Sequence, residues 1–96
     1  MKIESIKSKP LKLLILKDDD RLLPQAHRKK IRRIIRALMS MRTIQDFLDI
    51  PKGRPHRLKG ARSNTYAITV YANWRITFVY HEDDHSIHIL DFEDYH

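Results

Sequence analysis

Three short groups of polar residues carry side chains that could perform acid–base chemistry on a phosphodiester. They are His56-Arg57-Leu58-Lys59-Gly60, Asn73-Trp74-Arg75 and the last three residues, Asp94-Tyr95-His96. Attack by a ribose 2'-hydroxyl on the neighbouring phosphate needs a base, an acid and cations near the phosphoryl oxygens. His56 and His96 could act as base and acid. Lys59 and Arg75 could supply the positive charge, so that the reaction would need no metal ion or cofactor.

The residue types leave the division of these roles open. An unperturbed imidazole titrates at about pH 6.5, so one histidine can accept a proton while another donates one. Asp94 could orient a histidine, stabilise its charge or transfer a proton itself, and Tyr95 could stack on a base or position a hydroxyl. The competing interpretation is that His56 is an ordinary surface histidine and that residues 94–96 form a frayed chain end.

The length and composition restrict the kind of protein that can carry these groups. A chain of 96 residues predicts a single domain with a small core. The absence of cysteine excludes disulfides, thiolate nucleophiles and cysteine zinc sites, and it agrees with a reducing compartment. The first residues contain no secretory signal, and the apolar run at residues 13–16 is far shorter than the roughly 20 residues that span a bilayer. We therefore expect a cytoplasmic protein without membrane contact.

The positive charge of the chain is concentrated in its first two thirds. Residues 1–64 carry 18 Lys and Arg against 6 Asp and Glu, whereas residues 65–96 carry 1 against 6. Such an excess favours binding to phosphates, although an ordinary solvated basic surface would have the same composition. Ribosomal RNA or an acidic protein would fit. The predicted RNA- or ribosome-binding residues are Arg28, Lys29, Arg32, Arg33, Arg36, Arg57 and Arg62.

The apolar pattern predicts helices in the first half of the chain. Residues 2–6 are expected to form a strand, and Ser8 can cap a helix that ends near Lys17. Three consecutive aspartates, residues 18–20, then predict a water-exposed turn. Pro24 is expected to open the longest helix, residues 24–41, which buries Ile31, Ile34, Ile35, Leu38 and Met41. Thr43 can cap a short third helix.

The second half alternates in the manner of strands. Tyr66, Ile68 and Val70, then Trp74, Ile76, Phe78 and Tyr80, then Ile87 and Ile89 predict three antiparallel strands with one buried face, and a further edge strand is expected near Leu58. The fold class is therefore α+β, with two or three helices on one face of an antiparallel sheet. Arg75 points away from the core, where it would meet substrate or pair with a carboxylate such as Asp91.

The segments HRLKG, YAITVYANWRITFVY and DFEDYH together resemble the HigB branch of the RelE-type toxins, also known as plasmid-maintenance killer proteins. The resemblance covers nearly the whole chain. It implies a compact microbial-RNase-like fold and a toxin that enters the ribosomal A site and cuts the mRNA being translated. The implied partners are a HigA-like helix-turn-helix antitoxin, the 70S ribosome with mRNA and, through the antitoxin, operator DNA.

Carried over position by position, the resemblance selects His56, Lys59, Arg75, Asp94, Tyr95 and His96 as catalytic residues. Two positions depart from the family pattern. Arg57 stands where proline is frequent, and Ala72 stands where the hairpin turn commonly has glycine, so that Asn73 could take the positive φ instead.

Two other functions remain open at this stage. One is a noncatalytic RNA- or ribosome-binding module, and the other is a component of a repressor complex that binds DNA only with its antitoxin. The sequence shows no extended aromatic platform for single-stranded RNA, which favours docking on structured ribosomal RNA.

Overall fold

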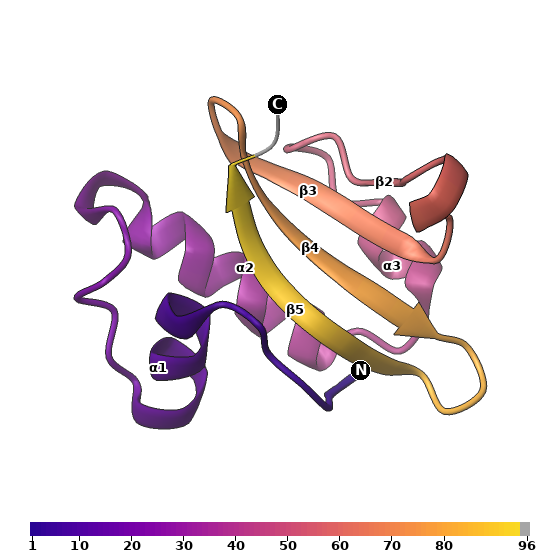
Figure 1. Ribbon diagram of the computed structural model, residues 1–96, viewed down its shortest axis with the longest axis horizontal. Helices are drawn as coiled ribbons and strands as arrows, with labels where there is room; N and C mark the ends of the chain where they lie inside the picture. Colours follow the sequence, from indigo (N-terminus) through magenta and orange to yellow (C-terminus); the bar gives the residue numbers. More distant parts are fainter. Residues whose placement is uncertain (95–96) are drawn as a thin grey trace.

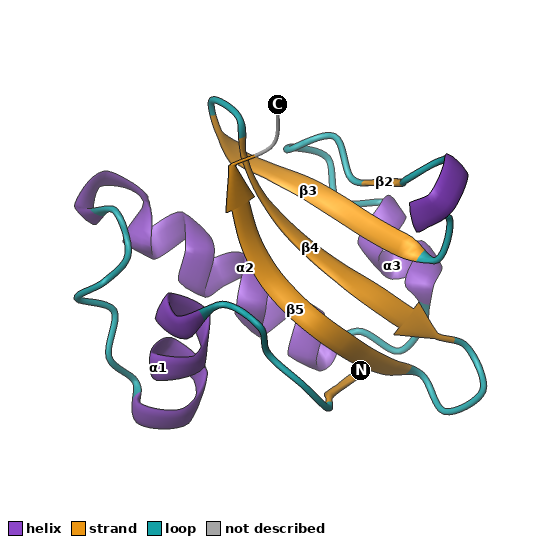
Figure 2. Ribbon diagram, in the orientation of Figure 1, coloured by secondary structure: helices purple, strands orange, loops and turns teal. Residues whose placement is uncertain are grey.

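The computed structural model describes residues 1–94, which form three α-helices and five strands (Figure 1). The helices are α1 (Lys9–Lys17), α2 (Arg28–Ser40) and α3 (Ile44–Leu48), and short 3-10 turns lie at Gln25–His27 and Gly60–Arg62. The strands are β1 (Lys2–Ile3), β2 (His56–Arg57), β3 (Thr65–Tyr71), β4 (Trp74–His81) and β5 (Ser86–Asp94). Figure 2 shows that loops make up most of the chain between α3 and β3.

The five strands form one mixed sheet in the order β1-β5-β4-β3-β2. The antiparallel pairs β2–β3, β3–β4 and β4–β5 agree with the three predicted long strands and the predicted edge strand. At the other edge β1 pairs with β5 in parallel, a pairing that the sequence had left open. The helices that follow β1 provide the crossover that a parallel pair requires. Strand β1 is also shorter than predicted, although Ile6 makes an isolated bridge to Leu90.

The helices begin where the local sequence satisfies their first backbone N–H groups. The Ser8 hydroxyl accepts a hydrogen bond in the first turn of α1, and Thr43 and Asp46 form a capping box on α3, so both predicted caps are confirmed. The predicted start of the long helix at Pro24 is wrong. Pro24 has an extended ψ of 124°, and the 3-10 turn Gln25–His27 precedes α2, which has no side-chain cap.

The apolar core lies between one face of the sheet and the helices. Its members include all the predicted α2 residues except Met41, which follows the helix and is half-buried, and the core is completed by Leu11, Leu14, Leu23, Phe47, Tyr66, Ile68, Val70, Ile76, Phe78, Ile87 and Leu90. In Figure 1, α2 and α3 pass behind the sheet. Within residues 1–94 no helix covers the opposite face, which we refer to as the open face. The predicted α+β layering is confirmed.

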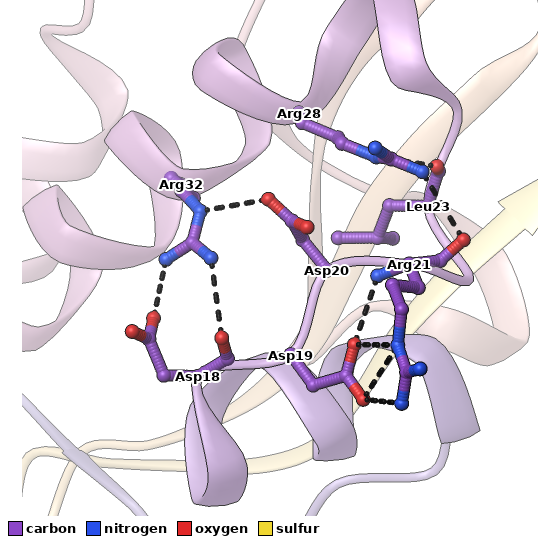
Figure 3. A network of polar contacts seen from close by, with 7 residues as sticks. All are labelled: Asp18, Asp19, Asp20, Arg21, Leu23, Arg28 and Arg32. Atoms are coloured by element: carbon purple, nitrogen blue, oxygen red, sulfur yellow. Dashed lines mark hydrogen bonds and ion pairs between the residues drawn. The ribbon is translucent and has the colours of Figure 1, made fainter.

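The three aspartates after α1 form ion pairs rather than a simple solvated turn (Figure 3). The Arg32 guanidinium on α2 lies 2.6 Å from Asp18 Oδ1 and 3.1 Å from Asp20 Oδ2. Arg21 contacts Asp19 at 2.9 Å, and its hydrogen bonds lower the pKa of Asp19 to about 2. The turn therefore binds α2 to the end of α1, which the local charge pattern did not predict.

Among the helices of residues 1–94, none combines the length and the apolar character that crossing a bilayer would take.

Candidate active site

The loop before β2 positions His56. Gly53 has φ +84°, and a Cβ on it would lie 2.7 Å from Ile68 Cγ1 and 2.8 Å from the Thr69 carbonyl oxygen, so only glycine fits this approach to β3. The Gly53 carbonyl accepts a hydrogen bond from Thr69 N at 2.8 Å. Arg54 follows with φ +51°, an uncommon conformation for a non-glycine residue. The loop is thus joined to β3 immediately before His56.

The contact between His56 and this loop defines which ring nitrogen faces the solvent. His56 Nδ1 lies 2.8 Å from the Arg54 carbonyl oxygen. A carbonyl oxygen can only accept, so Nδ1 carries the hydrogen and donates it. Nε2 is then the nitrogen left for chemistry, with a lone pair when the ring is neutral. A base at this position is therefore pre-oriented by the backbone.

His56 and Arg75 line one pocket on the open face of the sheet. The pocket has a volume of about 280 Å³, and its other lining residues are Arg54, Pro55 and Thr69. The register explains this meeting, because Thr69 on β3 lies opposite Arg75 on β4. Two arginines and one histidine in a pocket near the lower size limit for small-molecule sites favour a compact anion such as a phosphodiester. The predicted outward orientation of Arg75 agrees with this position.

A bulge in β5 determines which acidic residues reach the open face. Between the pairs Thr77–Asp91 and Val79–His88, β5 contains one more residue than β4. Ile89 lies within this segment with φ +52° and is 52% exposed, so the prediction that it packs inward is wrong. One inserted residue reverses the side of the sheet to which each later side chain of β5 points. Asp91 therefore lies on the open face.

Glu93 forms a cluster of polar contacts beside the site that the sequence did not single out, although it does not line the His56–Arg75 pocket. It lies opposite Arg75 in the β4–β5 register, whereas Asp91, the predicted neighbour of Arg75, lies opposite Thr77. The Glu93 carboxylate lies 2.9 Å from the Arg62 guanidinium and accepts a hydrogen bond from the Thr77 hydroxyl. Hydrogen bonds from the Arg62 side chain and from the Thr77 hydroxyl hold the pKa of Glu93 below its ordinary range. Only the register and the bulge could have indicated this cluster.

The other predicted catalytic residues are not all brought to the pocket. Lys59 is exposed just before the 3-10 turn Gly60–Arg62 and does not line the pocket. Asp94 ends β5 opposite Trp74 and is exposed. Tyr95 and His96 lie outside the described residues.

The predicted RNA- or ribosome-binding residues fall into two groups. Arg28 donates hydrogen bonds to the Leu23 and Arg21 carbonyl oxygens, and Arg32 pairs with the aspartate turn (Figure 3), so both are engaged within the protein. Arg57 donates to the Ser63 carbonyl oxygen, and Arg62 pairs with Glu93. The second group consists of Lys29, Arg33 and Arg36, whose exposed side chains have no such contact within residues 1–94 and which the helical repeat places on one stripe of α2.

Four rings stack where the β3–β4 hairpin meets the start of α2. The His27 and Tyr71 centroids are 3.9 Å apart with nearly parallel rings, and Trp74 lies between Tyr71 and Phe92. These rings pack against one another within the fold, so they leave untested the prediction that the chain lacks an extended aromatic platform for single-stranded RNA. The array is half-buried, and none of its rings lines the His56–Arg75 pocket.

The arrangement of helices on one face of the sheet matches that of known bacterial toxins. A solved structure described as the YoeB/ParE toxin from Agrobacterium tumefaciens superposes with a TM-score of 0.58 and 18% identity, covering 97% of this chain and 99% of that one. At this identity the likeness establishes only that the two chains share an α+β fold.

The sequence comparison then gives the family. The model of the RelE-like toxin of type II toxin–antitoxin system HigB matches residues 4–96, and the chain belongs to this family. It is 38% identical over 94 residues to the Endoribonuclease HigB of Proteus vulgaris, covering 98% of this chain and 99% of that protein. The resemblance predicted from HRLKG, NWRITF and DYH is confirmed. Membership of a type II system implies an antitoxin partner.

Proposed function

We propose that this toxin is a ribosome-dependent endoribonuclease that cuts translated mRNA in the A site. The observation that carries the proposal is the pocket in which His56, with its Nδ1 bound to the Arg54 carbonyl, faces Arg75. The name of the Proteus vulgaris relative, an endoribonuclease, supports the same activity.

The pocket suggests how the reaction would proceed. His56 Nε2 takes the proton from the 2'-hydroxyl, and the 2'-oxygen attacks the adjacent phosphorus. The bond from phosphorus to the 5'-oxygen breaks, and an acid protonates that oxygen. The products are a 2',3'-cyclic phosphate and a 5'-hydroxyl. Arg75 and Arg54 stabilise the negative charge that gathers on the phosphoryl oxygens.

The acid comes from the end of the chain in this proposal. Asp94 is exposed at the end of β5, and His96 follows two residues later in the sequence. We assign proton donation to His96, orientation of the reacting groups to Asp94 and Tyr95, and a further contact with the RNA backbone to Lys59.

Docking on the ribosome would use the exposed stripe of α2. The side chains of Lys29, Arg33 and Arg36 make no hydrogen bond or ion pair with other residues of the 1–94 range, so their charges are available to phosphates. The stripe belongs to a helix behind the sheet, while the pocket lies on the open face, so ribosomal RNA and mRNA could be contacted together. The proposal places the protein in the cytoplasm with a HigA-like helix-turn-helix antitoxin, through which it would also reach operator DNA.

The test is cleavage of a defined mRNA by the purified protein, with and without translating 70S ribosomes, mapped by primer extension. The comparison includes His56→Ala and, as a matched control, His81→Ala, which removes an exposed histidine next to the β4–β5 turn. Loss of one proton-transfer group should lower the cleavage rate by about 10² or more, while the control keeps the wild-type rate.

Two outcomes would contradict the proposal. Rapid cutting of ribosome-free mRNA at low enzyme concentration would show that cleavage does not depend on the ribosome. A wild-type cleavage rate for His56→Ala would show that His56 takes no part in the proton transfer.

A further inference from the structure

An apolar groove lies at the β1 edge of the protein, between the N-terminal segment and α1. It has a volume of about 610 Å³ and is lined by Met1, Lys2, Ile3, Glu4, Ser5, Ile6, Lys12, Ile15, Leu16 and Met39. A second hollow of about 290 Å³ continues it between α1 and α2, and the two share Ile15 and Met39. Together they form one furrow along α1, which we refer to as the α1 groove.

The α1 groove exposes large apolar side chains that the fold does not use. Leu16 is 68% exposed and Met39 is 55% exposed, although both border apolar side chains of the groove floor. Contiguous exposed apolar surface bordered by polar groups is typical of an interaction site. Methionine in particular is enriched at protein interfaces because its flexible side chain adapts to a partner.

The polar border of the groove is basic. The Lys2 side chain is paired with Glu4 at 3.3 Å, whereas the side chains of Lys12 and Arg36 make no hydrogen bond or ion pair within residues 1–94. Arg32 also lines the second hollow, but its charge is paired with Asp18 and Asp20, so the basic border rests on Lys12 and Arg36. An occupant would therefore present apolar side chains to the floor and carboxylates to the border.

We propose that the α1 groove binds an acidic, amphipathic segment of the antitoxin. The chain belongs to a type II toxin family, and so it has an antitoxin partner. An amphipathic helix in an apolar groove is a common mode of peptide recognition, and the furrow along α1 suits that shape. The groove lies at the β1 edge, while His56 lies at the β2 edge of the same sheet, so the two sites share no residue. The inference rests on the proposed function only in requiring the antitoxin.

The test measures binding of the purified protein encoded beside the toxin gene, by calorimetry, to wild-type toxin and to variants. Leu16→Glu and Met39→Glu place a carboxylate on the groove and should each weaken binding at least tenfold. Leu22→Glu is the matched control, because Leu22 is 53% exposed on the α1–α2 connection outside the groove, and it should bind normally. Circular dichroism checks that each variant is folded.

A second pair of variants tests the charge. Lys12→Glu removes a basic group from the groove border, whereas Lys9→Glu makes the same change on an exposed face of α1 that does not line the groove. Only Lys12→Glu should weaken binding, and the effect should shrink as salt is raised.

Cleavage of mRNA by the same variants separates this inference from the proposed function. Groove variants that cut normally and escape the antitoxin support it, and weaker antitoxin binding supports it even if wild-type toxin proves not to cut RNA. Normal antitoxin binding by both Leu16→Glu and Met39→Glu would overturn it, as would no binding to wild type. A wild-type homodimer that Leu16→Glu dissociates would assign the groove to a second copy of this chain and overturn it too.

Discussion

Glu93→Gln should lower the free energy of unfolding by a small amount that depends on pH. Glu93 is 23% exposed and Arg62 is 44% exposed, so water screens their ion pair and its contribution stays below about 1 kcal/mol. The glutamine oxygen can still accept the hydrogen bond from the Thr77 hydroxyl. Glu93→Ala removes this acceptor from a threonine that is 1% exposed and should cost about 2 kcal/mol.

The pH dependence of Glu93→Gln distinguishes the ion pair from loss of packing. Arg62 and Thr77 lower the pKa of Glu93 in the folded state, so the folded protein binds fewer protons than the unfolded chain in acid. The stabilisation is complete above the unfolded pKa, about 4.3, and is lost as the pH falls through the lower folded value. The difference between wild type and Glu93→Gln should therefore be constant from neutral pH to about pH 5 and shrink below it.

The assay is urea unfolding followed by circular dichroism at a series of pH values between neutral and acid. The slope with urea should not change, since the substitution leaves the buried surface nearly the same. A difference that stays constant into strong acid, or no difference at neutral pH, would refute the assignment of this stability to the charge of Glu93.

Three further substitutions test how the fold positions the site. Gly53→Ala should reduce both stability and cleavage, measured by urea unfolding and primer extension, because its Cβ would meet β3. Gly60→Ala is the control and should cost less, because Gly60 also has a positive φ but a Cβ there would have no atom within 4 Å. Ala72→Gly should raise the free energy of unfolding by up to about 1 kcal/mol, because Ala72 has φ +46° in the hairpin turn. Arg32→Ala should speed amide hydrogen exchange in residues 18–23, and Arg33→Ala, which removes an exposed charge, should not.

Patterns that depend on neighbouring residues were predicted well from the sequence. The caps of α1 and α3 and the burial of the α2 stripe each depend on a few adjacent side chains, and all were confirmed except the burial of Met41. The turn of the first hairpin shows the limit of this approach. Ala72 itself takes the positive φ that was expected to pass to Asn73.

Features that depend on pairing between distant segments were missed. The bulge at Ile89 adds one residue to β5, and an alternating pattern read along a single strand cannot detect it. The parallel pairing of β1 and the ion pairs of Arg32 were missed for the same reason, because the partner in each case lies on another element of the fold. Charge counts along α2 therefore overestimated how many arginines are available to RNA.

The same reasoning explains why His56 could be proposed but not placed from the sequence. Histidine and arginine are suitable for phosphodiester chemistry wherever they occur, but their meeting depends on the opposition of Thr69 and Arg75 across β3 and β4. It depends equally on Gly53, whose missing side chain lets the loop approach β3. Because the orientation of His56 Nε2 comes from a backbone carbonyl, most side chains could replace Arg54 without changing it. The fold of the loop should therefore tolerate substitutions at Arg54 far better than at Gly53, whereas removing the Arg54 charge from the pocket should still slow cleavage.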